Sequence, residues 1–178
     1  MRLFVAVPVP DELKGRLAAL GMEIAQDGIS LVKPDNMHLT LKFLGETRDA
    51  ELKTIGKRLA SVRFAPFQCE LRGVGVFPSE QYVRVVWAGA ESGGKLESLA
   101  KDVIGALSGY GADDRFTAHL TIARVKRKLA LSPFLEKHKG ESFGRFDVSV
   151  FRLMQSELGP SGPKYSVLAE FPAGQSDA

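Results

Sequence analysis

Two short stretches of this sequence place a histidine and a threonine two residues apart, and the two stretches read almost alike. One is His38-Leu39-Thr40-Leu41 and the other is His119-Leu120-Thr121-Ile122. In both, apolar residues alternate with the polar pair, which is typical of a half-buried β-strand. The histidine and threonine of each copy are therefore expected on one strand face, about 6.5 to 7 Å apart at a rise of about 3.3 Å per residue.

Two imidazoles and two hydroxyls that face one cleft would suit acid/base chemistry at phosphorus. An imidazole titrates near neutrality, so one can act as the general base and the other as the general acid, while hydroxyls donate hydrogen bonds to anionic oxygens. In this hypothesis the histidines deprotonate the nucleophile and protonate the leaving oxygen, and Thr40 and Thr121 hold the phosphate oxygens. A single His-x-Thr is more often structural, but two of the three histidines in this chain fall in matching frames.

The two stretches resemble the paired His-x-Thr-x signatures of the 2H phosphoesterase superfamily. Their surroundings narrow the resemblance to its RNA 2′,3′-cyclic phosphodiesterase branch, historically called 2′-5′ RNA ligase. The similar segments are Leu39–Gly45, Gly73–Pro78, Tyr82–Gly89 and His119–Val125. Each is a weak signal alone, but their order and spacing together are specific, and the resemblance runs from Arg2 to Tyr165.

This resemblance implies a reaction and a role for each site residue. The reaction is hydrolysis of a 2′,3′-cyclic phosphate at an RNA end to a 2′-phosphate, with the 3′ oxygen leaving. It implies that His119 is the base that accepts a proton from water and that His38 is the acid that donates one to the leaving oxygen. Thr40, Thr121 and Arg124 would bind the phosphate. We expect no cofactor and no metal.

Three alternative functions use the same residues differently. Reverse ligation, which joins a 2′,3′-cyclic phosphate to a 5′-hydroxyl through a 2′-5′ bond, would employ the same four side chains. A non-catalytic RNA-end binding protein would keep the cleft but would not need paired histidines. A metallohydrolase with His38 and His119 as ligands would need a nearby third histidine or cysteine, and threonines stand where it would have carboxylates.

The composition is that of a globular protein with one core. The chain has 178 residues, of which 44% are hydrophobic and 25% charged, and its net charge of +3 permits an anionic partner without requiring one. We expect one bilobal domain over residues 1–172 and a disordered tail over residues 173–178. The single cysteine, Cys69, is expected to be buried and indicates a reducing compartment. The apolar run Leu3–Val9 is too short to span a membrane, so we expect a cytoplasmic protein. We also expect a monomer.

Hydrophobic periodicity predicts an α+β fold. Helical stripes occur near residues 10–28, 49–62 and 95–107, and alternating or apolar runs predict the strands between them. The order of strand, helix and strand repeats loosely around the two His-x-Thr copies. We therefore expect two pseudo-symmetric lobes, each an antiparallel sheet with helices outside, that line a central cleft. The resemblance implies the same bilobal fold.

The alternation leaves the position of Arg124 open and places Trp87 in the core. Counting by twos from His119 puts Arg124 on the apolar face, where an unpaired guanidinium is costly, so either the strand bends or the parity fails. Trp87 shares strand parity with Val83 and Val85, which predicts that it packs in the core.

Other side chains receive simpler expectations. Phe77 is expected in the core, with base stacking as the alternative, and His138 is expected to be exposed and without function. Lys126–Lys128 is expected to form a solvated loop, with contact to the RNA backbone as the alternative. Residues 141–158 and 164–172 are read as two strands around a rigid loop, Gly159–Pro163. This loop could rim the cleft, with a plain turn as the equal alternative.

Overall fold

The computed structural model describes residues 1–112 and 115–174. Two 3₁₀ turns, η1 (Pro34–Asn36) and η2 (Asp49–Glu51), accompany the longer elements. The helices are α1 (Asp11–Met22), α2 (Leu52–Ala60), α3 (Lys95–Ala106) and α4 (Ser132–Lys137). The strands are β1 (Arg2–Pro8), β2 (Ile29–Leu31), β3 (His38–Glu46), β4 (Phe67–Ser79), β5 (Tyr82–Glu91), β6 (His119–Val125), β7 (Ser142–Val148), β8 (Val150–Gly159) and β9 (Gly162–Pro172).

The strands form two antiparallel sheets, and each sheet contains one of the His-x-Thr strands. The first sheet has the order β3-β1-β8-β9 and the second has the order β2-β6-β5-β4-β7. The lobes are not successive halves of the chain, because β2 joins the second sheet and the C-terminal strands β8 and β9 return to the first. This exchange ties the two sheets together, and β3 contacts β6 where they meet.

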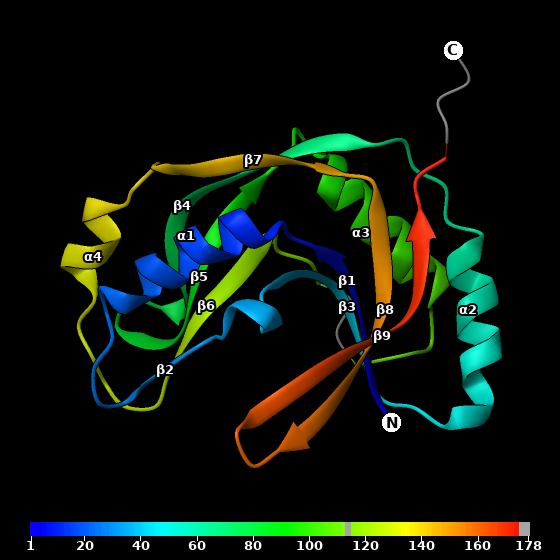
Figure 1. The fold of residues 1–178 in the computed structure, drawn as a ribbon, viewed down its shortest axis with the longest axis horizontal. Helices are drawn as coiled ribbons and strands as arrows, with labels where there is room; N and C mark the ends of the chain where they lie inside the picture. Colours follow the sequence, from blue (N-terminus) through cyan, green and yellow to red (C-terminus); the bar gives the residue numbers. More distant parts are fainter. Residues whose placement is uncertain (113–114, 175–178) are drawn as a thin grey trace.

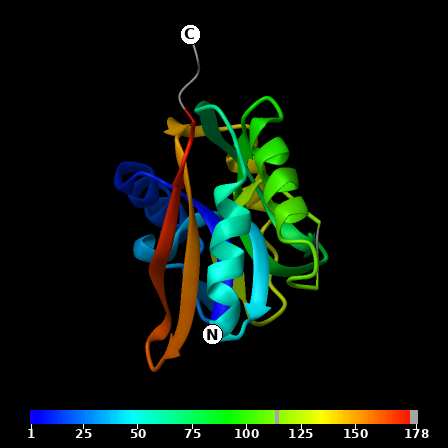
Figure 2. The same cartoon turned by 90° about the vertical axis from the view of Figure 1, so that its right-hand side faces the viewer.

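The helices lie outside the sheets, as the sequence predicts (Figure 1). Helix α1 follows β1 of the first sheet but packs against β6 and β7 of the second, and α3 precedes β6 of the second sheet but contacts β3 of the first. The apolar stripe of α1, which includes Leu13, Leu17 and Leu20, is buried. In the second view, α2 and α3 lie beside the first sheet and contact each other (Figure 2).

The predicted α+β fold with two antiparallel sheets is confirmed, with one difference in the C-terminal part. The segment 141–158, read as one strand, is two strands that separate at Ser149 and join different sheets. Of the predicted tail, the backbone amides of Ala173 and Gly174 bond to the carbonyl oxygens of Ser149 and Phe64 at 2.8 and 3.0 Å. Residues 175–178 lie outside the described part.

The prediction that Trp87 packs in the core is wrong, because strand β5 carries an extra residue. Phe77 pairs with Val85 and Pro78 with Val83, so Arg84 is left over as a bulge. The bulge turns Val83 onto the buried face while Val85 and Trp87 remain on the other face. Trp87 is consequently half-buried on the side of the sheet that carries the His-x-Thr pair.

Candidate active site

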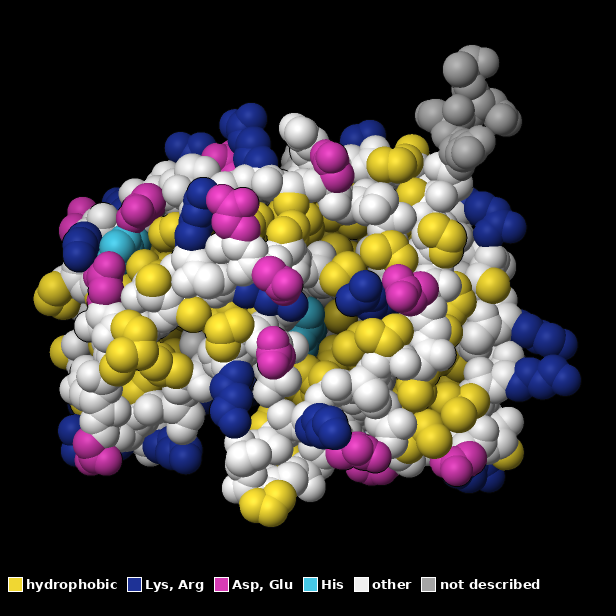
Figure 3. Space-filling model, in the orientation of Figure 1, with side chains coloured by type: hydrophobic (Ala, Val, Ile, Leu, Met, Phe, Trp, Pro, Cys, Tyr) yellow, Lys and Arg dark blue, Asp and Glu magenta, His cyan; other side chains and the backbone are white. Residues whose placement is uncertain are grey.

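One cleft collects the histidines and threonines of both motif strands. This cavity of about 510 Å³, called the motif cleft below, is lined by His38 and Thr40 from β3 and by His119, Thr121 and Arg124 from β6. All five predicted site residues therefore meet in one place. On the face shown in Figure 3, a histidine side chain is visible in a hollow near the middle of the molecule, with basic side chains close by.

Each of the two motif strands contains a β-bulge, at the equivalent position. In β3, Thr40 and Lys42 pair with adjacent residues of β1, and Leu41 is the extra residue between them. In β6, Thr121 and Ala123 pair with adjacent residues of β5, and the extra residue between them is Ile122. The bulge therefore follows the threonine of each motif and reverses the side-chain parity after it.

This shift of parity settles the position of Arg124. Beyond the bulge, Ala123 is buried and Arg124 is exposed on the same face as His119, so its guanidinium lies at the cleft and not in the apolar core. In β3 the same shift buries Lys42 and exposes Phe43 at the matching position. Phe43 and Arg124 are thus equivalent positions of the two pseudo-symmetric strands.

Each catalytic candidate lies between two aromatic rings. The ring of His38 stacks on Phe4 at 4.8 Å between centroids and meets Tyr165 edge-on at 5.3 Å. The ring of His119 meets Phe77 edge-on at 5.0 Å and Trp87 at 6.2 Å. These rings remove water from the imidazoles, and loss of hydration disfavours the charged form.

Burial consequently lowers the pKa of both histidines. Desolvation brings the pKa of His38 to about 4, and the nearby positive charges of Lys14 and Arg124 act in the same direction. Desolvation, followed by the charge of Arg124, also lowers the pKa of His119. Both imidazoles are therefore neutral at neutral pH in the free protein.

A backbone carbonyl orients each ring. Nδ1 of His119 donates a hydrogen bond to the carbonyl oxygen of Thr117 at 2.7 Å, since a carbonyl can only accept. His38 forms a backbone hydrogen bond with Asn36, which is likewise two residues before its histidine. In His119 this contact leaves Nε2 as the nitrogen that can take or give a proton.

The tip of the β8–β9 hairpin closes one side of the motif cleft, so the first of the two roles considered for Gly159–Pro163 applies. Nζ of Lys33 donates to the carbonyl oxygen of Ser161 at 3.2 Å, and Nδ2 of Asn36 donates to that of Pro163 at 2.9 Å. Sequence reasoning missed the contribution of Tyr165, which lines the cleft beside this tip. The glycines and prolines around the turn were the available signal for the loop, but nothing signalled which ring would face His38.

Residues of the predicted basic loop divide between the cleft and the surface. Lys126 lines the motif cleft. Arg127 instead pairs with Asp27, with Nη1 and Oδ2 3.2 Å apart. The expectation of a wholly solvated loop therefore holds only in part.

Phe77 and Trp87 form one wall beside His119, and Gly75 leaves space for the ring of Trp87. Their rings lie 5.2 Å apart. A Cβ at Gly75 would come within 2.2 Å of the Trp87 ring, so this position accepts only glycine while the ring stays in place. Gly73 has φ +69° and lies at a bulge of β4, a usual position for glycine in a strand.

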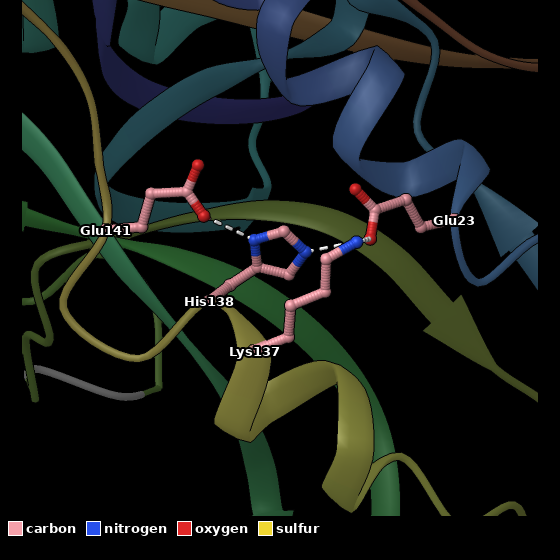
Figure 4. A network of polar contacts seen from close by, with 4 residues as sticks. All are labelled: Glu23, Lys137, His138 and Glu141. Atoms are coloured by element: carbon pink, nitrogen blue, oxygen red, sulfur yellow. Dashed lines mark hydrogen bonds and ion pairs between the residues drawn. The ribbon is translucent and has the colours of Figure 1, made fainter.

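The prediction that His138 is exposed is wrong. Only 4% of its surface is accessible, and its ring joins the end of α4 to two other segments (Figure 4). Nε2 lies 2.8 Å from Glu23, which follows α1, and Nδ1 bonds to Glu141, which precedes β7. Burial alone would lower the pKa of His138, but hydrogen bonds to Glu141 and Glu23 outweigh it and raise the pKa. His138 is therefore a structural residue away from the cleft.

Three further observations concern Cys69, metal binding and the lengths of the helices. Cys69 is fully buried, as predicted, and burial raises the pKa of its thiol to about 12. Within residues 1–112 and 115–174, no cluster of three or more His, Cys, Asp or Glu side chains is arranged to hold a metal ion. No helix in the same part of the chain is long and apolar enough to cross a membrane.

Known proteins resemble this chain in sequence over nearly its whole length. The sequence profile of the LigT-like phosphoesterases matches residues 7–87. The RNA 2′,3′-cyclic phosphodiesterase of Archaeoglobus fulgidus is 43% identical over 175 residues, which cover 96% of this chain and 99% of the relative. The protein of the same name from Methanocaldococcus jannaschii is 36% identical, with 96% and 100% covered.

Solved structures share the fold. The crystal structure of a Thermus thermophilus protein superposes with a TM-score of 0.80 at 37% identity, and 97% of each chain is covered. The structure of E. coli LigT complexed with 3′-AMP superposes with a TM-score of 0.83 at 25% identity, and 98% of each chain is covered. Both the sequence and the fold therefore show that this chain belongs to the RNA 2′,3′-cyclic phosphodiesterase family of LigT-like phosphoesterases.

Proposed function

We propose that this chain hydrolyses a 2′,3′-cyclic phosphate at the end of an RNA and leaves a terminal 2′-phosphate. The observation that carries the proposal is the pair of matching strands that bring His38, Thr40, His119 and Thr121 into one cleft. The activity named for the relatives at 43% and 36% identity supports it, and so does the binding of 3′-AMP by the similar E. coli LigT.

The proposed reaction needs one proton acceptor and one proton donor. The neutral Nε2 of His119 accepts a proton from water as the water oxygen forms a bond to phosphorus. The bond from phosphorus to the 3′ oxygen breaks, and His38 gives a proton to that oxygen. The 2′ oxygen keeps the phosphate, so atoms and charge balance over the turnover.

The remaining site residues act on the phosphate. The hydroxyls of Thr40 and Thr121 donate hydrogen bonds to the non-bridging oxygens, where negative charge grows in the transition state and a fixed donor is worth most. The guanidinium of Arg124, exposed at the cleft, binds the same group, and its planar fork suits a phosphate.

Substrate binding must prepare His38 for its role as donor. Because its pKa is about 4 in the free protein, His38 is neutral at pH 7 before the substrate arrives. A bound phosphate carries negative charge into the cleft, and an opposite charge nearby favours the protonated imidazole. In this proposal the substrate therefore brings about the protonation that its own cleavage requires.

The proposal also includes the oligomeric state and the cellular location of the enzyme. The site is built from one chain, so residues 1–172 would act as one bilobal domain and the monomer would suffice. The lone, buried Cys69 is in keeping with a cytoplasmic, reducing environment.

Alanine variants of the three histidines test the mechanism. His38→Ala and His119→Ala should each lose about 10² to 10⁴-fold in turnover of a cyclic-phosphate oligonucleotide, the usual worth of one general acid or base. His138→Ala is the matched control, because it removes an imidazole outside the cleft and should keep its turnover below its melting temperature. Near-full turnover by either cleft variant would refute the two-histidine mechanism.

A sulfur-substituted substrate assigns the two roles. A thiolate leaving group needs little protonation, so a substrate with sulfur at the 3′ position should largely rescue His38→Ala and should not rescue His119→Ala. Rescue of the other variant would exchange the roles. Rescue of neither would mean that no histidine protonates the leaving atom.

A further inference from the structure

The β8–β9 hairpin ends in a two-stranded arm that projects beyond the rest of the first sheet (Figure 1). Strand β8 pairs with β1 over residues 152–156. In the described part of the chain, residues 157–164 pair only with each other, and we call them the arm. A hairpin of two strands is marginally stable by itself. The position of the arm therefore depends on what its tip contacts.

The tip of the arm rests on the segment that leads into β3. Nδ2 of Asn36 donates to the carbonyl oxygen of Pro163 at 2.9 Å, and Nζ of Lys33 donates to that of Ser161 at 3.2 Å. The lysine contact restrains the tip less, because the side chain of Lys33 is exposed and its four-carbon stem is flexible. Asn36 has a short side chain and belongs to the 3₁₀ turn η1, where its backbone N–H bonds to the carbonyl oxygen of Lys33. Asn36 is therefore the firmer attachment.

Asn36 is connected to the ring of His38 by two routes. Its backbone bonds to that ring directly. Its side chain holds Pro163, and two residues further along β9 the ring of Tyr165 meets the ring of His38 edge-on at 5.3 Å. Tyr165 also contacts Phe4, with 5.0 Å between the ring centroids. Release of the tip would take Tyr165 away from His38, whereas the stack of His38 on Phe4 of β1 would remain.

We propose that Asn36 is a positioning residue for His38: its side-chain amide fixes the arm so that Tyr165 packs on the imidazole and keeps water away from it. This inference rests on the proposed function only for the role of His38 as the proton donor. Asn36 does not touch the reacting atoms and acts through Tyr165. Removal of either side chain should therefore make the other one matter less.

Charged and titratable side chains from several elements line the two cavities that contain His38, the motif cleft and a small cavity of about 60 Å³ on its other side. They are Lys14 of α1, Lys33 and Asp35 at η1, His119 and Arg124 of β6, Lys126 after β6, Arg152 of β8 and Tyr165 of β9. Replacement of the neutral Asn36 by alanine changes none of these charges. A different titration of His38 in that variant would therefore report a change in the hydration of its ring.

An NMR titration of the histidines tests this role without a substrate. In Asn36→Ala the midpoint of His38 should rise from about 4 by about 1 to 2 pH units, toward its ordinary value of about 6.5, because the ring becomes hydrated. The midpoints of the other two histidines should stay the same, whereas general unfolding would move all three. Asn36→Gln keeps an amide donor and should keep the low midpoint. Gln155→Ala is the matched control, because this amide of the same hairpin bonds to Glu157 and not to η1; it should change neither the midpoint nor turnover.

A double-mutant cycle shows whether Asn36 acts through Tyr165. Asn36→Ala should lower kcat about 10- to 100-fold with a smaller change in KM, because a misplacement of about 1 Å can cost 10²-fold. The double variant Asn36→Ala/Tyr165→Ala should be no slower than Tyr165→Ala alone. An unchanged His38 midpoint in Asn36→Ala, or losses that multiply in the double variant, would overturn the positioning role. If the unmodified protein did not hydrolyse a cyclic-phosphate oligonucleotide, the proposed function would fail, but the titration of His38 would still decide whether Asn36 and the arm keep water from its ring.

Discussion

The low pKa values of the two cleft histidines predict an acid-shifted rate profile. Catalysis needs one neutral and one protonated imidazole, so a plot of kcat/KM against pH should be bell-shaped. Its two limbs report the pKa values of these groups in the free enzyme. Burial among aromatic rings lowers the pKa of His38 to about 4 and also lowers that of His119. Both limbs should therefore lie below pH 6.5, whichever histidine is the acid.

The size of the effect follows from the pKa of His38. With a pKa of about 4, roughly one molecule in 10³ carries a proton on this ring at pH 7. Above pH 6.5, kcat/KM should accordingly fall about tenfold for each pH unit. The pH profile of kcat reports the pKa values in the enzyme–substrate complex. Its alkaline limb should lie about 1 to 3 pH units above that of kcat/KM, because the bound phosphate stabilises the imidazolium.

Steady-state kinetics of a cyclic-phosphate oligonucleotide between pH 4 and 9 give both profiles. An NMR titration of the free protein provides an independent check, since the chain has only three histidines. His38 and His119 should titrate below pH 6.5, and His138 above it. A kcat/KM that stays flat from pH 6.5 to 8, or a His38 midpoint at or above 6.5, would refute the reasoning. The limbs belong to the coupled pair and do not themselves assign the roles.

Three further predictions concern single side chains. Thr40→Val and Thr121→Val should each lower kcat by about 10² to 10³-fold with little change in KM, because a donor aimed at growing phosphate charge acts mainly in the transition state; steady-state kinetics measure this. His138→Ala should lower the free energy of unfolding at pH 6 by about 1 to 2 kcal/mol, the lower range for charged hydrogen bonds because the partner carboxylates are exposed. Because the pKa of His138 is raised in the folded state, this stabilisation is complete below the unfolded pKa of about 6.5 and is lost as the pH rises through the folded pKa. Denaturant titrations should therefore show that the difference in unfolding free energy between the unmodified protein and His138→Ala becomes smaller as the pH rises. Gly75→Ala should displace the ring of Trp87, the only tryptophan, change its fluorescence and reduce turnover.

Matched variants separate these effects from general damage. Thr54→Val changes an exposed threonine of α2 and should leave kcat unchanged. Gly56→Ala adds a Cβ that meets nothing within 4 Å, so the fluorescence of Trp87 should stay the same. A deficit of His138→Ala that widened with rising pH would contradict the ion-pair account. Equal losses in Thr40→Val and Thr54→Val would remove the special role of the cleft hydroxyl.

The sequence was sufficient for the features that depend on regular periodicity. The alternation in both motifs correctly placed His38, Thr40, His119 and Thr121 on accessible strand faces, with Leu39 buried. The helical stripes correctly located α1, α2 and α3. These features depend on neighbours a few residues apart, which a single sequence records directly.

The errors occurred where the register between strands changes. The bulge at Arg84 placed Val83 on the face opposite to Trp87, and the bulge at Ile122 decided between the two readings of Arg124. An extra residue in a strand is defined by the strand opposite, so the period of one strand alone does not show it. The burial of His138 could not be predicted for a similar reason, because its partner Glu23 lies on a distant segment that folding brings to the end of α4.

The measurement that tests the central claim most directly is the identity of the product. An oligoribonucleotide that ends in a 2′,3′-cyclic phosphate is incubated with the unmodified protein and, in parallel, with His119→Ala, and the position of the phosphate is determined by ³¹P NMR. The account predicts a terminal 2′-phosphate from the unmodified protein and unchanged cyclic phosphate from His119→Ala. A 3′-phosphate product, or equal conversion by the variant, would contradict it.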